Sequence, residues 1–224
     1  MKLSIVIPAY NEQDNITHCI ADVATQFPDA EIIVVNDAST DATEKLLSTM
    51  DLPNLKVVTN LQNQGHGFSV VKGLRNATGD YVLYIDADRQ IDLINYDFSQ
   101  SVPYYGVISG WRVGRHDKTF RKVISFCLKM TILLRYGMYI RDANCPYKVY
   151  NRLTLLTLLD RLPPTYIIPI ACLEVIVRKY KIPVLTIPTP HKPYPGGERT
   201  GKLQSLNSVS LKFFWSAFLE IISL

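Results

Sequence analysis

The sequence predicts an α/β fold in which a mostly parallel central sheet carries helices on both faces. Short β-branched apolar runs occur at residues 3–7, 31–35, 55–58 and 81–85, with the length and composition of buried strands. Segments with apolar residues at helical spacing separate them. Strands that alternate with helices pair in parallel, and helices then cover both faces of the sheet. With 224 residues, 47% of them apolar and 20% charged, the chain can form one large globular domain.

The first half of the chain alternates regularly between strands and helices. Residues 14–27 place apolar side chains at helical spacing, and residues 67–77 predict a second long helix. A shorter helix follows the second strand. Ser39 or Thr40 can cap it, since Asp41 and Glu44 then place acidic side chains in the first turn. Each of the first four strands is therefore followed by a loop at the same end of the sheet.

The second half is less regular. The apolar pattern predicts strands at 106–113 and 184–187, an extended segment at 147–150, and helices at 120–135, 153–162, 170–181 and from 206 onward. Residues 191–202 are rich in proline and glycine and predict a mobile loop before the last helix. We divide the chain into a domain of residues 1–204 and an apolar C-terminal helix of residues 205–224.

Composition and residue patterns argue against a nucleic-acid-binding, a secreted or a membrane-spanning protein. The net charge of +4 and the pI near 8.8 fit phosphate-bearing substrates or an anionic membrane face, and no nucleic-acid partner is expected. The four cysteines are scattered without a CxxC pair or zinc spacing, which predicts reduced thiols in a cytosolic setting. The N-terminus reads as a strand and not as a signal peptide. No apolar stretch reaches the roughly 18 residues that indicate a transmembrane helix.

Two carboxylates, Asp86 and Asp88, directly follow the strand at 81–85. Alternate side chains of a strand share a face, so both can point the same way. Carboxylates held that close repel each other unless a cation lies between them or one is protonated. Oxygen ligands suit Mg²⁺ or Mn²⁺, which usually also binds substrate phosphates. The pair indicates a metal-dependent site for a nucleotide diphosphate; the alternative is that Asp86 caps a turn and Asp88 is solvated.

Polar residues also follow the other three predicted strands of the first half: Tyr10 and Glu12, then Asp37, then Asn60. Ligands of parallel α/β sheets bind beyond the carboxyl ends of the strands, which strengthens the prediction of a site there. Two other nucleotide folds are disfavoured, because the chain has no GxGxxG after its first strand and no Gly-Lys-Ser/Thr. A bound diphosphate would therefore be neutralised by a cation and by basic side chains.

Four motifs stand in order along roughly the first 90 residues. They are Ser-Ile-Val-Ile-Pro-Ala-Tyr-Asn-Glu at 4–12, Val-Asn-Asp-Ala-Ser-Thr-Asp at 35–41, Asn-Gln-Gly-His-Gly at 63–67, and Ala-Thr-Gly-Asp at 77–80 leading into Asp-Ala-Asp-Arg-Gln at 86–90. Together they resemble family 2 glycosyltransferases, in the branch similar to dolichyl/polyprenyl-phosphate sugar transferases. Residues 141–148 more loosely resemble the acceptor-side segment of that branch, and residues 199–202 its phosphate-binding loop.

The resemblance implies a nucleotide-diphospho-sugar transferase fold (GT-A, Rossmann-like), a divalent cation (Mg²⁺ or Mn²⁺) and inversion at the anomeric carbon. It implies donor binding by Pro8, Tyr10, Glu12, Asp37, Gln64, Gly65, Asp86 and Lys202, and metal ligation by Asp86, Asp88 and Gln90. Asp88 and Arg199 would be catalytic, with Arg199 and Lys202 gripping the phosphates once their loop closes. The domain of residues 1–204 would then be the catalytic domain.

The acceptor side is less well defined. Arg121 and Cys145 are weaker matches to the branch, and Cys145-Pro146 replaces its commoner Ser-Gly, so the acceptor stays open. A lipid phosphate needs no strong general base, because a monoester with a second pKa of about 6 is mostly dianionic at pH 7. A hydroxyl acceptor needs a carboxylate base, for which Glu174 is the candidate. We favour the alternative that Glu174 pairs with Arg178 one turn later.

The helices at 120–135 and 206–224 are apolar over most of their circumference, and basic residues lie near the first of them. We expect them to lie peripherally on the cytoplasmic face of a membrane; the alternative is packing on the sheet or a homodimer contact. The leading function is transfer of a sugar from a UDP- or GDP-linked donor to a polyprenyl phosphate in the making of cell-envelope glycans. The alternatives are a saccharide or lipid hydroxyl acceptor, or a non-catalytic peripheral nucleotide-sugar-binding protein.

Overall fold

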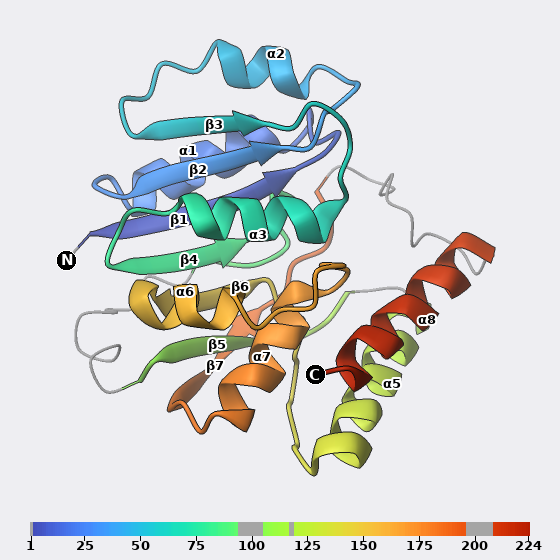
Figure 1. The fold of residues 1–224 in the computed structure, drawn as a ribbon. Coiled ribbons are helices and arrows are strands. Elements are labelled where there is room, and N and C mark those ends of the chain that lie inside the picture. Colours follow the sequence, from blue (N-terminus) through green and yellow to red (C-terminus); the bar gives the residue numbers. More distant parts are fainter. Residues whose placement is uncertain (1, 94–104, 117–118, 196–207) are drawn as a thin grey trace.

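The computed structural model describes residues 2–93, 105–116, 119–195 and 208–224. Within them the strands form a 7-stranded sheet in the order β3-β2-β1-β4-β6-β5-β7 (Figure 1). The strands are β1 (Leu3–Ala9), β2 (Glu31–Asn36), β3 (Leu55–Thr59), β4 (Tyr81–Ile85), β5 (Val107–Val113), β6 (Tyr147–Asn151) and β7 (Val184–Pro190). All pairs are parallel except those that β6 makes with β4 and β5. The predicted mostly parallel sheet is confirmed.

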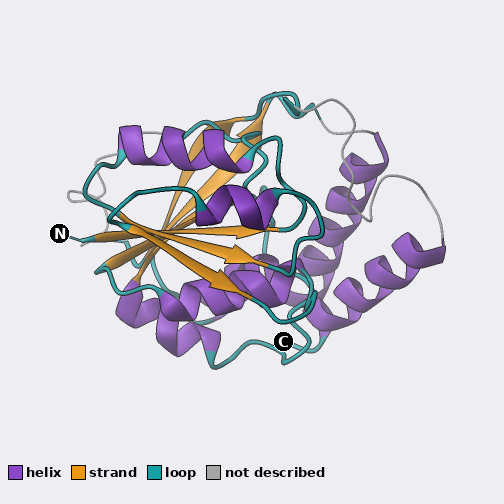
Figure 2. Ribbon diagram, turned by 90° about the horizontal axis from the view of Figure 1, so that it is seen from above, coloured by secondary structure: helices purple, strands orange, loops and turns teal. Residues whose placement is uncertain are grey.

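Helices cover both faces of this sheet, as Figure 2 shows from above. They are α1 (Ile16–Gln26), α2 (Thr43–Ser48), α3 (His66–Asn76), α5 (Thr119–Tyr136), α6 (Arg152–Leu159), α7 (Pro169–Lys179) and α8 (Ser208–Ile222). Alternate residues of β1 enter two separate cores: Ile5 and Ile7 pack with α1, whereas Val6 packs with α3. Burial on both faces explains why the central strands β1, β2 and β4 are mostly apolar.

Gly73 of α3 shows how closely a helix lies on the sheet. A Cβ atom at this position would stand 2.4 Å from Cγ1 of Val6 on β1. The glycine therefore lets the backbone of α3 approach the first strand, and this packing positions the start of α3 beside the carboxyl ends of β1 to β4 (Figure 1).

The helices α5 and α8 lie side by side off the end of the sheet at which β1 to β4 finish (Figures 1 and 2). Their inner sides join the core that α3 and α7 make with the sheet, through Ile132 and Ile221. Tyr136 donates a hydrogen bond to the carbonyl of Ile221 at 2.7 Å. In the described part of the chain, no helix combines the length and apolarity needed to cross a membrane.

The predicted caps of α2 were wrong. The helix begins after Ala42, and neither Ser39 nor Thr40 caps it. Instead, the Ser39 hydroxyl donates to Oδ1 of Asn36 at 2.6 Å, and the Thr40 N–H donates to Oδ1 of Asn11 at 2.8 Å. The Thr40 contact joins the loop after β2 to the loop after β1, at the edge where the candidate site lies.

The predicted loop at 191–202 is described only as far as residue 195, and the boundary predicted at 204/205 lies outside the described residues. The proposed division into a domain and a C-terminal helix therefore stays a prediction. Arg199 and Lys202 also lie outside the described residues.

Candidate functional site

Four neighbouring strands, in the order β3-β2-β1-β4, end at one edge of the sheet. The candidate residues after each strand are thus brought together, as the sequence predicted. Three residues that follow these strands have left-handed backbone: Asn11 (φ 53°), Ala38 (φ 54°) and Arg89 (φ 56°). Non-glycine residues rarely adopt such angles, and the residues that do so cluster at active sites and ligand-binding segments.

Asp37, predicted to bind the base, is buried and already holds a loop. Its Oδ1 accepts from Asn60 Nδ2 at 2.7 Å and from the N–H of Gln64 at 2.9 Å, and its Oδ2 accepts from the N–H of Gly65 at 2.8 Å. Gly65 has φ 95°, which only glycine adopts easily. An ionised carboxylate has about four acceptor positions, so one is left for a ligand. Asp37 therefore orders the segment that leads into α3, and its contact with a base stays a prediction.

Asp86 accepts a hydrogen bond from its own strand and lies close to a histidine at the start of α3. The Tyr84 hydroxyl donates to its Oδ1 at 2.6 Å, and His66 Nε2 lies 3.2 Å from the same hydroxyl and 3.7 Å from Oδ1. Burial, together with the Asp86 carboxylate, raises the pKa of Tyr84 well above its ordinary value, so the phenol stays protonated. Neither His66 nor Tyr84 was assigned a role from the sequence. The only signal in the sequence was that Tyr84 lies two positions before Asp86, so that their side chains can share a face of the strand.

Asp88 and Gln90 form a compact turn after Asp86. The N–H of Gln90 donates to Oδ1 of Asp88 at 3.1 Å. The Gln90 side chain donates to the carbonyl of Lys192 at 3.1 Å, and the N–H of Lys192 donates back to the carbonyl of Gln90 at 2.7 Å. Gln90 therefore fastens the residues that begin the 191–202 loop to the Asp-Ala-Asp turn.

The donor set of Asp86, Asp88 and Gln90 is chemically suited to Mg²⁺ or Mn²⁺, because every available ligand atom is oxygen. Among the described residues, no group of three His, Cys, Asp or Glu side chains could hold a metal by itself. A cation of this kind commonly completes its coordination with substrate phosphates and water. The residues present fit such a shared site.

Pro8, Tyr10 and Glu12 follow the first strand at the same edge. Pro8 is buried within β1, and Tyr10 is 43% exposed. Glu12 accepts from Asn15 Nδ2 at 2.9 Å, and its carbonyl accepts from the N–H of Ile16 at the start of α1. Glu12 thus helps to begin α1 while its side chain lies at the predicted donor side.

Glu174 belongs to a buried charge cluster. Its Oε2 lies 2.8 Å from Nζ of Lys148 on β6 and accepts from the Ser109 hydroxyl of β5 at 3.0 Å, and its Oε1 lies 2.6 Å from Arg178. The favoured pairing with Arg178 is confirmed. Both oxygens are occupied, and Glu174 and Lys148 are 1% and 0% exposed. Nothing in the sequence signalled the pairing with Lys148.

Cys145 is also buried, and burial raises the pKa of its thiol to about 12. Its side chain is packed in the core that α1 forms with the sheet. A direct contact between Cys145 and an acceptor stays a prediction that this position does not favour.

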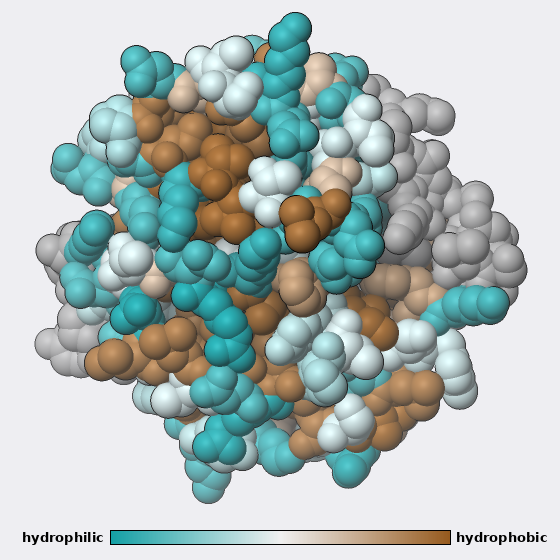
Figure 3. Space-filling view, turned by 45° about the horizontal axis from the view of Figure 1, so that its top comes forward, coloured by the Kyte–Doolittle hydropathy of each residue, from teal (hydrophilic) through white to brown (hydrophobic). Residues whose placement is uncertain are grey.

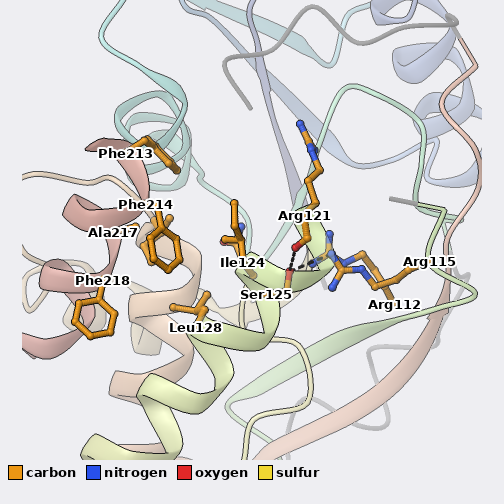
Figure 4. Close-up of a pocket in the computed structure, with 12 residues that line it drawn as sticks. Arg112, Arg115, Arg121, Ile124, Ser125, Leu128, Phe213, Phe214, Ala217 and Phe218 are labelled. Carbon is orange, nitrogen blue, oxygen red and sulfur yellow. Dashed lines mark hydrogen bonds between the residues drawn. The ribbon is translucent and has the colours of Figure 1, made fainter. Parts of the chain in front are cut away.

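Arg121 lines a cavity of about 130 Å³ between α5 and α8 (Figure 4). One wall is basic and the other aromatic; the lining includes Arg112, Arg115 and Arg121, and Leu128, Phe213, Phe214 and Phe218. Asp142 holds Arg112 by two hydrogen bonds, at 2.7 and 2.8 Å, and Ser125 accepts from Arg115 at 3.1 Å. These contacts fix the guanidinium groups of Arg112 and Arg115, and an apolar wall faces them.

The outer sides of α5 and α8 expose large apolar residues. Val123, Phe126, Trp215 and Leu219 are 52%, 57%, 59% and 49% exposed. Lys129 lies over the ring of Phe126, 5.8 Å from its centroid. In the space-filling view, apolar residues reach the surface among polar ones, including at the lower right, the side on which α5 and α8 lie (Figure 3).

Residues 4–93 match the model of a protein family described as glycosyl transferase family 2. An undecaprenyl-phosphate 4-deoxy-4-formamido-L-arabinose transferase of Klebsiella pneumoniae is 29% identical over 193 residues, covering 82% of this chain and 59% of that protein. The protein of the same name from Yersinia enterocolitica is 32% identical over 162 residues, covering 67% and 49%. The chain thus spans between about half and three fifths of the length of these curated relatives.

Solved structures share the fold. Glucosyl-3-phosphoglycerate synthase of Mycobacterium tuberculosis, in complex with phosphoglyceric acid, superposes with a TM-score of 0.70 at 18% identity, covering 98% of this chain and 80% of that one. Staphylococcus aureus TarS 1–349 with UDP gives 0.59 at 23% identity, covering 86% and 61%. A mannosyltransferase of Pyrobaculum calidifontis with GDP-Man and Mn²⁺ gives 0.58 at 20%, covering 87% and 58%. The expected GT-A fold is confirmed.

Proposed function

We propose that this chain, whose residues 4–93 belong to glycosyl transferase family 2, transfers a sugar from a nucleotide-diphosphate sugar to a polyprenyl-type phosphate with inversion at the anomeric carbon. The two relatives reported above are named as undecaprenyl-phosphate sugar transferases. The cavity between α5 and α8, with arginines on one wall and aromatic residues on the other, is the observation that carries the acceptor assignment.

On the donor side, Tyr10, Glu12 and Asp37 would contact the nucleoside, and Gln64 and Gly65, whose N–H groups donate to Asp37, would line the same donor site. Asp86, Asp88 and Gln90 would hold Mg²⁺ or Mn²⁺; a bound divalent cation would neutralise charge that builds up on the departing diphosphate. Crystal structures that share this fold contain Mn²⁺ with UDP-glucose or GDP-Man. Arg199 and Lys202 would add positive charge to the same leaving group.

On the acceptor side, a phosphate monoester is already an anionic nucleophile at pH 7, because its second pKa is about 6. No residue then has to remove a proton. Guanidinium groups bind phosphate oxygens through paired N–H donors, and the aromatic wall from α8 would pack against the first isoprene units. The occupied carboxylate of Glu174 favours this reading over a hydroxyl acceptor.

A lipid acceptor requires the protein to reach a membrane. The exposed Phe126, Trp215 and Leu219, with Lys129 over the Phe126 ring, make α5 and α8 suited to lie in the interface of an anionic membrane. We assign this contact to the cytoplasmic face, where nucleotide sugars are available. Liposome flotation would test it: a chain that stays unbound by phosphatidylglycerol vesicles contradicts the membrane contact.

The first experiment is a donor and acceptor screen. UDP- and GDP-sugars are offered with Mn²⁺, Mg²⁺ or EDTA, with and without a short polyprenyl phosphate, to the wild type, Asp88→Ala and Asp51→Ala. Asp51 is exposed and serves as the matched control. We expect release of one nucleoside diphosphate that requires the metal, increases with the lipid phosphate and is lost only in Asp88→Ala.

Two other outcomes would change the proposal. Metal-dependent release without stimulation by lipid would retain the transferase and redirect the acceptor to hydroxyl groups, with Glu174 to be tested next. No release from any donor, with nucleotide binding intact, would favour a binding protein without catalytic activity.

A further inference from the structure

A directed chain of hydrogen bonds ends on one oxygen of Asp86. Tyr84 is 3% exposed and its hydroxyl has one proton, which it donates to Oδ1 of Asp86 at 2.6 Å. The oxygen of that hydroxyl lies 3.2 Å from Nε2 of His66. Because the Tyr84 proton is already used, Nε2 must be the donor in this second contact. The order is therefore His66 to Tyr84 to Asp86.

This series of hydrogen bonds makes the two oxygens of the Asp86 carboxylate different from each other. Oδ1 accepts from Tyr84, and His66 Nε2 lies 3.7 Å from it. Within the described residues, Oδ2 of Asp86 makes no hydrogen bond or ion pair. The Asp86 side chain is 27% exposed. A carboxylate held in this way presents one oxygen to a ligand and keeps the other for the protein.

Asp37, a second candidate site residue, positions His66, at which this series of hydrogen bonds begins. Asp37 accepts hydrogen bonds from the N–H groups of Gln64 and Gly65, and His66 is the next residue and the first of α3. The close packing of α3 on β1 through Gly73 keeps this helix start in place. The loop at the predicted base site and the carboxylate at the predicted metal site are thus joined through His66 and Tyr84.

We propose that Tyr84 and His66 are positioning residues that set the orientation of Asp86, so that Oδ2 serves as its single ligand atom for the divalent cation. The proposal rests on the metal site of the proposed function. Partners that orient a metal ligand typically change metal affinity about 10- to 100-fold when they are removed. Tyr84 acts directly on the carboxylate, whereas His66 acts through Tyr84, so its removal has the smaller effect.

The test measures Mn²⁺ binding by the electron paramagnetic resonance signal of the free ion, with UDP present. We expect Tyr84→Phe to weaken Mn²⁺ binding about 10-fold, with an unchanged melting temperature and unchanged UDP binding in EDTA. His66→Ala should weaken it less, and His66→Gln should restore binding because the amide can donate to Tyr84. Tyr81→Phe is the control, a half-buried tyrosine at the other end of β4.

Two further variants separate this inference from the function on which it rests. Loss of Mn²⁺ binding in Asp86→Asn and Asp88→Ala, with unchanged binding in Tyr84→Phe, would overturn the positioning role and leave the metal site intact. Unchanged binding in Asp86→Asn and Asp88→Ala would overturn both. A Tyr84→Phe variant that loses UDP binding in EDTA, or melts at a lower temperature, would show a structural role and also overturn the inference.

Discussion

Glu220 of α8 accepts a hydrogen bond from the backbone N–H of Ile168, the residue that precedes α7, at 2.8 Å. The same carboxylate accepts from the N–H of Ile167 at 2.9 Å and from the Thr165 hydroxyl at 2.7 Å. It is 4% exposed. The first N–H groups of a helix have no partner within the helix and carry partial positive charge, so a buried carboxylate is stabilising there. The last helix is therefore docked on the body of the protein, which keeps the wall it gives to the arginine-lined cavity in place.

Glu220→Ala should lower the free energy of unfolding by roughly 3 kcal/mol, because it leaves buried N–H groups without an acceptor. For a chain of this size the melting temperature should fall by about 6–12 °C. Thermal denaturation followed by circular dichroism measures both. Lys212→Ala, at an exposed position of the same helix, should melt with the wild type; equal melting of all three proteins would contradict the docking role.

Lys148→Met should lower the free energy of unfolding by about 3–5 kcal/mol, because Glu174 loses its buried charged partner and keeps only the partly exposed Arg178 as a counter-charge. The double variant Lys148→Met with Glu174→Leu should recover a large part of this loss, since both fully buried charges are then removed and the remaining Arg178, whose side chain is 25% exposed, can be hydrated. Urea denaturation of the two variants and of the exposed control Lys45→Met provides the comparison. A double variant as unstable as the single one would mean that the packing of the lysine stem matters more than its charge.

Asp142 makes stability depend on pH in acid. Burial by itself would raise the pKa of its carboxyl, but the hydrogen bonds and charge of Arg112 outweigh burial and hold that pKa below the ordinary value of 3.8. A group whose pKa is lower in the folded state contributes stability above its unfolded pKa and loses it as the pH falls through the folded value. The stability difference between wild type and Asp142→Asn should therefore be constant near neutral pH and shrink below about pH 4.

Urea denaturation between pH 7 and pH 3 measures this difference. Asp51→Asn, at an exposed position, should give no comparable pH dependence. A difference between wild type and Asp142→Asn that stays constant throughout this range would refute the role of the Arg112 pair.

The cysteines should differ in reactivity. Cys19, Cys145 and Cys172 are buried, and burial raises the pKa of each thiol, to about 12 for the first two. Thiolate is the reactive form, so these three should react slowly with a disulfide reagent. Only the partly exposed Cys127 should be modified rapidly in the native protein, and Cys127→Ser should remove that fast phase. A second fast thiol in the variant would place one of the other three at the surface.

Much of the fold could be predicted because its signals are local. The β-branched runs that became β1 to β4 lie within five to seven residues each. The central strands β1, β2 and β4 are buried on both faces and are therefore mostly apolar, whereas the edge strand β3 is partly exposed. The spacing of Asp86 and Asp88 likewise follows from one short segment. The caps of α2 were missed because Ser39 bonds to Asn36 at the end of β2 and Thr40 bonds to Asn11 after β1. These partners compete with the helix end for the same hydroxyl and N–H groups.

The sequence by itself determined the alternation of strands and helices, the strand end at which the polar residues gather and the resemblance to family 2 glycosyltransferases. Only the tertiary structure decided which side chains meet. Lys148 meets Glu174 across 26 positions of the chain, His66 reaches Tyr84 across 18, and Glu220 reaches Ile168 across 52. Such contacts depend on how the helices pack on the sheet. Side-chain complementarity determines that packing, and it leaves no periodic pattern in the sequence.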